Sequence, residues 1–82
     1  MTTDVLKQTA IDLLRKKNDD LRKCIAWWKD EGDLKYLETI KEFEAVVRLN
    51  ELFIERLPEW PLDREFLQKW VNELLADSLN LE

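Results

Sequence analysis

Apolar residues recur along the chain at the three- and four-residue spacing of amphipathic helices, in three stretches separated by short polar breaks. This pattern predicts helices over about residues 4–31, 34–57 and 63–79, within one domain that spans residues 1–82. We therefore expect an all-α fold, an antiparallel three-helix bundle or helical hairpin with a long central helix.

The first predicted helix has one apolar face and begins at Thr3 or Asp4, either of which can cap it. The polar run Lys16–Asp20 interrupts this face, as either a solvated turn of one long helix or a break. We expect one continuous helix, because Leu14 and Leu21 stay in phase across the run. The apolar face comprises Leu6, Ala10, Leu13, Leu14, Leu21, Cys24, Ile25 and Trp28.

The connections between the helices are marked by their residue types. Gly32 is the only glycine, and we expect it to end the first helix in the left-handed conformation, with Asp33 capping the second. Two prolines within residues 58–61 end the second helix, and Asp63 is the predicted cap of the third. These residues also fit the P-x-x-P pattern of polyproline ligands, but a connector that places Trp60 against the bundle end is the stronger interpretation.

The central helix carries a heptad repeat with additional apolar residues outside it. From Ala45 onward these additional residues, among them Val46, Leu49 and Phe53, leave only a narrow polar stripe. Two neighbouring helices cannot cover so much apolar surface, so we predict a homodimer associated through the heptad seam. The seam comprises Ile40, Phe43, Val47, Asn50 and Ile54, and the polar stripe comprises Glu44, Arg48, Glu51 and Glu55.

Asn50 is the one polar residue of the seam. A polar residue at such a position often pairs with its symmetry mate and fixes the register of two helices. The alternative is that Asn50 faces water at the edge of the seam. We favour the pairing, since Val47 and Ile54 are its neighbours along the seam.

Two adjacent tryptophans, Trp27 and Trp28, cannot both lie on one narrow helix face, because adjacent helical residues point about 100° apart. Trp28 lies on the apolar face and is a predicted core residue. Trp27 either covers the edge of the core or anchors a protein interface, where tryptophan is enriched. The sequence leaves both interpretations open.

Composition excludes several kinds of chemistry. The chain has no histidine, one cysteine and one glycine, so it contains no Cys–His or Ser–His–Asp arrangement and no glycine-rich phosphate loop. The segment DEGD lacks the spacing of a calcium loop, and we expect Cys24 to be inert within the apolar face. We therefore predict no enzyme, no cofactor and no metal site.

The net charge of −5 is unevenly distributed. Residues 1–30 carry seven Lys or Arg and five acids, whereas residues 31–82 carry six and thirteen. A basic first helix packed beside an acidic second helix explains this distribution best. The alternative is that the first helix binds nucleic acid, and a helix lying on a membrane surface is a weaker alternative. The residues of the nucleic-acid alternative are Arg15, Lys16, Lys17, Arg22 and Lys23.

We predict a small acidic regulator, inhibitor or adaptor that docks on another protein, as phage-type accessory factors do. A single cysteine and the lack of a long apolar segment or signal-peptide core favour a cytoplasmic location. The candidate contacts with the partner protein are Trp27, Trp60, Glu44, Arg48, Glu51 and Glu55.

Overall fold

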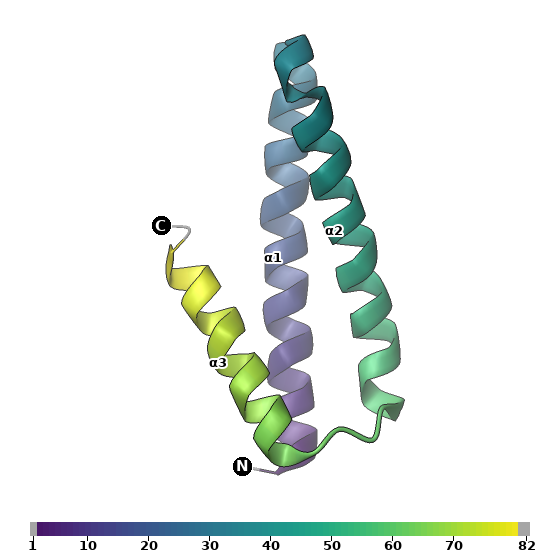
Figure 1. Ribbon diagram of the computed structural model, residues 1–82, viewed down its shortest axis with the longest axis vertical. Helices are drawn as coiled ribbons and strands as arrows, with labels where there is room; N and C mark the ends of the chain where they lie inside the picture. Colours follow the sequence, from purple (N-terminus) through teal and green to yellow (C-terminus); the bar gives the residue numbers. More distant parts are fainter. Residues whose placement is uncertain (1, 81–82) are drawn as a thin grey trace.

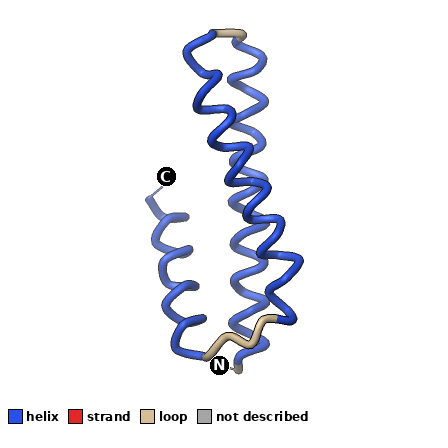
Figure 2. Tube along the Cα trace, turned by 45° about the vertical axis from the view of Figure 1, so that its right-hand side comes forward, coloured by secondary structure: helices blue, strands red, loops and turns tan. Residues whose placement is uncertain are grey.

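The computed structural model, which describes residues 2–80, has three α-helices, and the second and third pack on the first (Figures 1 and 2). α1 spans Thr3–Glu31, α2 spans Leu37–Arg56 and α3 spans Arg64–Asn80. α2 returns antiparallel to α1, and α3 then runs antiparallel to α2 beside the lower half of α1 (Figure 1). The described residues include no strand, and the predicted all-α bundle is confirmed.

α1 is one uninterrupted helix of 29 residues, so the polar run Lys16–Asp20 does not break it. Its N-cap is Thr2, one residue before the predicted Thr3, and the Thr2 hydroxyl accepts a hydrogen bond from the backbone N–H of Val5 at 3.3 Å. α1 ends at Gly32, whose φ of 68° is the left-handed conformation expected of the only glycine.

α2 is shorter than predicted, because a 3₁₀ turn flanks it at each end. The turn η1 (Leu34–Tyr36) precedes α2, and the Asp33 side chain accepts a backbone hydrogen bond from that turn at 3.0 Å. The turn η2 (Leu57–Glu59) follows α2. Asp63 caps α3 as predicted, because its Oδ1 accepts from the N–H of Phe66 at 2.7 Å.

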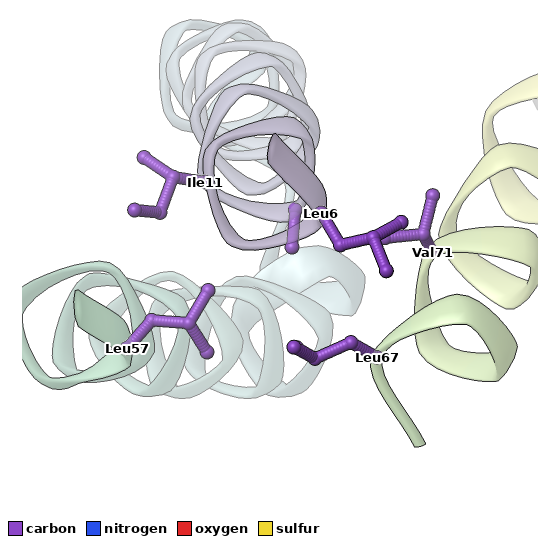
Figure 3. Close-up of a cluster of buried hydrophobic side chains, with 6 residues drawn as sticks. Leu6, Ile11, Leu57, Leu67 and Val71 are labelled. Atoms are coloured by element: carbon purple, nitrogen blue, oxygen red, sulfur yellow. The ribbon is translucent and has the colours of Figure 1, made fainter. Parts of the chain in front are cut away.

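A lower core joins α3 and the end of α2 to the first half of α1 (Figure 3). Aromatic rings close this core at its edge: the Phe53 ring meets Trp60 edge-on at 5.7 Å between centroids and Trp70 at 5.5 Å. The buried residues of the lower core are Leu6, Ala10, Ile11, Leu57, Leu67 and Val71.

An upper core lies between the second half of α1 and the first half of α2, without any residue of α3. Ile25 of α1 and Ile40 and Val47 of α2 are buried in it. Partly buried side chains surround these three residues: Leu21, Trp28, Tyr36 and Phe43. The upper half of the molecule is therefore a two-helix hairpin, whereas the lower half contains three helices.

A pair of buried asparagines separates the two cores. The side-chain amide of Asn50 donates to Oδ1 of Asn18 at 2.9 Å, and the amide of Asn18 donates to the carbonyl oxygen of Val47 at 3.2 Å. Asn50 thus pairs within its own chain, and it neither faces water nor needs a symmetry mate for this hydrogen bond. Asn18, which the sequence placed in a solvated run, is only 2% exposed.

The outer face of α2 stays open in the single chain. Val46, Leu49 and Leu52 are 38%, 49% and 43% exposed, and α1 is the only helix that packs extensively against α2. The shape agrees with this openness, since the molecule measures 45 × 25 × 15 Å and is as thin as one to two helices. The apolar surplus expected of the central helix therefore remains at the surface.

The asparagine pair makes a prediction about stability. Replacing Asn50 with Leu removes the donor to a buried oxygen of Asn18, and we expect the free energy of unfolding to fall by about 1–3 kcal/mol. The double variant Asn18→Leu/Asn50→Leu should recover most of this loss, because no unsatisfied side-chain amide remains. Urea denaturation of the two single variants and the double variant measures the coupling. If the double variant lost as much free energy of unfolding as the two single variants together, the predicted coupling between Asn18 and Asn50 would be contradicted.

Candidate functional site

The candidate site is the flank of the α1–α2 hairpin that α3 does not reach. α3 packs along one stripe of α1, and the ion pair between Lys17 and Asp77, at 3.4 Å, lies near the end of this contact. On α1, Cys24 lies seven residues after Lys17. On α2, Phe53 contacts Trp70 of α3, and Val46 lies seven residues before Phe53. Cys24 and Val46 therefore continue the α3-facing stripes beyond the end of α3 (Figure 1). We call this surface the tip flank; it comprises Leu21, Cys24, Trp27, Trp28, Phe43 and Val46.

The two adjacent tryptophans have different environments on the tip flank. Trp28 is partly buried, stacks on Tyr36 at 5.6 Å between centroids and meets Phe43 edge-on at 4.9 Å. Trp27 is 56% exposed, and its one neighbouring aromatic ring is that of Tyr36 at 6.2 Å. Trp28 thus belongs to the upper core, whereas Trp27 stands at its edge.

Cys24 is exposed, which contradicts the expectation that its thiol fills the apolar face. The length of α3 explains the difference. Leu6, Ala10 and Leu13, earlier on the same stripe of α1, pack into the lower core, but α3 ends before it reaches Cys24. Periodicity predicted the face correctly and could not predict where the covering helix ends.

Three acidic residues border the tip flank. Asp20 and Glu31 lie four residues before and seven residues after Cys24, and Glu42 lies four residues before Val46. Helical spacing therefore places Asp20 and Glu31 beside Cys24 on α1, and Glu42 beside Val46 on α2. All three acidic residues are exposed. None of them takes part in the ion pairs that the described residues form. The tip flank is therefore an apolar, aromatic surface with acidic edges.

The predicted self-association seam faces α1 of the same chain. Ile40, Val47 and Asn50 are buried there, and Phe43 and Ile54 are partly buried. These side chains are thus already in contact within one chain. The apolar side chains left open on α2 lie outside the predicted seam, at Val46, Leu49 and Leu52.

The polar stripe of α2 borders α1 on the opposite side of the hairpin. Glu51 pairs with Arg22, and Glu44 pairs with Lys29 at 3.7 Å. Of the four stripe residues that we predicted as partner contacts, two are therefore paired within the chain. This agrees with the expected packing of a basic helix beside an acidic one. The remaining two, Arg48 and Glu55, are exposed.

Trp60, the other predicted contact, closes the bottom of the bundle. Its side chain is partly buried against the lower core, and its carbonyl oxygen accepts a hydrogen bond from Nζ of Lys7 at 2.7 Å. This placement agrees with a connector that packs against the bundle end.

The five basic residues of the nucleic-acid alternative point in several directions. Lys17 pairs with Asp77 of α3, while Arg22 pairs with Glu51 of α2 and with Asp19 at 3.7 Å. Arg15 borders the same groove as Arg22, whereas helical spacing places Lys16 and Lys23 on the outer side of α1. The structure does not bring these side chains together into one basic surface.

Among the described residues, no three His, Cys, Asp or Glu side chains gather where they would hold a metal ion. No helix within this part of the chain is long and apolar enough to cross a membrane.

Compared with protein-family models, with curated proteins and with solved structures, the chain matches none.

The different environments of the two tryptophans predict different losses of stability. Trp28→Ala should lower the free energy of unfolding by about 3 kcal/mol, the lower end of the range for this substitution, because Trp28 is only partly buried. Trp27→Ala should cost less than about 1 kcal/mol. Urea denaturation followed by circular dichroism compares them. Equal losses would mean that Trp27 serves the core and is not free for a partner.

Proposed function

We propose that this chain is a small non-enzymatic protein that binds another protein through the tip flank. The observation that carries the proposal is the early end of α3, which leaves an apolar, aromatic stripe of α1 and α2 uncovered where a third helix would continue. Exposed contiguous apolar surface on a small protein is typical of an interaction site. Trp27, 56% exposed on the α1 side of the tip flank, is the expected anchor.

The shape and charge of the tip flank define the partner. Because the site continues the line of α3, the segment that fits it is an amphipathic helix packed against α1 and α2 beyond the end of α3. The acidic edges, at Asp20, Glu31 and Glu42, favour lysine and arginine on both sides of the apolar face of that helix. The partner is therefore a protein with a basic amphipathic helix, and this chain acts as its inhibitor, regulator or adaptor.

A photo-cross-linking experiment tests the proposal in the organism that encodes the chain. Benzoylphenylalanine placed at Trp27 should cross-link to one protein, whose linked peptide is a basic amphipathic helix identified by mass spectrometry. The matched control carries the same group at Lys69, an exposed residue of α3 on a different face. Charge reversal of the edges in Asp20→Lys/Glu31→Lys should weaken the cross-link, because it removes the attraction for a basic helix.

Other outcomes would overturn the proposal. Equal cross-linking from Trp27 and Lys69 would mean that the contact is not specific to the tip flank. A cross-link to nucleic acid would favour the alternative that uses the basic residues of α1. A cross-link to a second copy of this chain alone would make the tip flank an interface between copies.

A further inference from the structure

The outer face of α2 carries a second heptad seam, distinct from the one that packs on α1. Its members alternate at spacings of four and three residues, and all of them are exposed. We call it the outer seam; it comprises Glu38, Glu42, Ala45, Leu49, Leu52 and Arg56. No ion pair among the described residues involves its two acids or its arginine.

The order of residue types along the outer seam is the informative feature. Two acids occupy the first half of α2, three apolar residues its middle and one arginine its last turn. If two copies of α2 pack antiparallel, Arg56 of each copy lies near Glu38 and Glu42 of the other, and the leucines meet in the middle. A parallel pair would place acid against acid and arginine against arginine, so charge favours the antiparallel arrangement.

The whole chain, with its tip flank and outer seam both uncovered, exposes more area than a compact protein of its mass. The accessible surface is 6101 Å², whereas a compact protein of the same mass exposes about 5,200 Å². The excess of about 900 Å² is close to the roughly 800 Å² that each partner buries in a standard protein interface. The radius of gyration, 14.6 Å, likewise exceeds the roughly 12 Å expected of a compact domain of this length.

We infer that two copies of this chain associate through the outer seams of their α2 helices, packed antiparallel about a two-fold axis. The interface is isologous, because the same seam serves both copies. Leu49 and Leu52 form its apolar centre, and reciprocal pairs of Arg56 with Glu38 and Glu42 form its two ends. This surface shares only the bordering Glu42 with the tip flank, so the dimer presents two tip flanks to partners and does not depend on the proposed function.

Analytical ultracentrifugation measures the association of the full chain and its variants. The unaltered chain should sediment at about twice 9.9 kDa. Leu49→Glu should be monomeric at concentrations where the unaltered chain is dimeric, because it places a charge at the apolar centre. Leu52→Lys is a second variant with the same expected result, and circular dichroism checks that both keep their helices. An unaltered chain that stays monomeric at about 100 μM, or a Leu49→Glu variant that stays dimeric, would overturn the inference.

Charge exchange tests the antiparallel arrangement. Arg56→Glu should raise the dissociation constant about tenfold, because each end of the interface then carries only acids. Adding Glu38→Arg and Glu42→Arg to Arg56→Glu should restore the original dissociation constant, since the pairs return with their signs exchanged. A triple variant that dissociates as readily as Arg56→Glu alone would contradict the antiparallel pairing.

Disulfide cross-linking gives an independent readout of direction. In a Cys24→Ser background, a mixture of Glu38→Cys and Arg56→Cys chains should form a mixed disulfide, whereas neither variant alone should cross-link. Efficient self-cross-linking of Glu38→Cys would establish a parallel pair and overturn the inference. Trp27→Ala should leave the dimer unchanged, so failure of the tip-flank proposal and failure of the dimer are separable.

Discussion

α1 is longer than the helix that covers one of its sides, and this difference determines which apolar side chains the molecule buries. At 1.5 Å per residue, the 29 residues of α1 extend about 43 Å and the 17 of α3 about 26 Å. Where all three helices overlap, Leu6 of α1 and Leu67 of α3 are buried together with Leu57, which directly follows α2. Beyond the end of α3, equivalent positions of the same stripes, such as Cys24 and Val46, face solvent. The tip flank therefore follows from helix length and not from a change in sequence pattern.

The buried asparagine pair gives the α1–α2 hairpin a single register. Sliding α1 against α2 by one helical turn would place each carboxamide among aliphatic side chains without a partner, at a cost of about 1–3 kcal/mol for each buried group. The leucines and isoleucines on either side of the pair favour one register less strongly, because aliphatic side chains tolerate other neighbours of similar size. Apolar burial thus supplies most of the stability of the hairpin, and Asn18 with Asn50 supplies much of its specificity.

Helix positions and both connections followed from periodicity and capping residues in the sequence. The heptad seam of α2 was also visible there, but we assigned it to a second copy, whereas it packs against α1 of the same chain. The pairing of the two asparagines did not follow from the sequence, although Asn18 stands at heptad spacing between Leu14, Leu21 and Ile25 and so had a signal of its own. Its four charged neighbours made the run appear solvated, because hydropathy averaged over a run conceals one inward position. The tip flank was equally inaccessible from the sequence, since it depends on where α3 ends in space. In this region the core position of Trp28 and the peripheral position of Trp27 were foreseen.

The division into two cores has a consequence for motion. The lower half is held by three helices and an aromatic cluster, whereas the upper half relies on the contact of two helices beyond the asparagine layer. Local opening requires less free energy where fewer buried contacts must separate, so we expect backbone amides near the Gly32 turn to exchange their hydrogens sooner than those of the lower core. A ligand seated between the helix ends would slow that exchange in proportion to its occupancy. Binding at the tip flank, as proposed, would therefore also make this half of the hairpin more rigid.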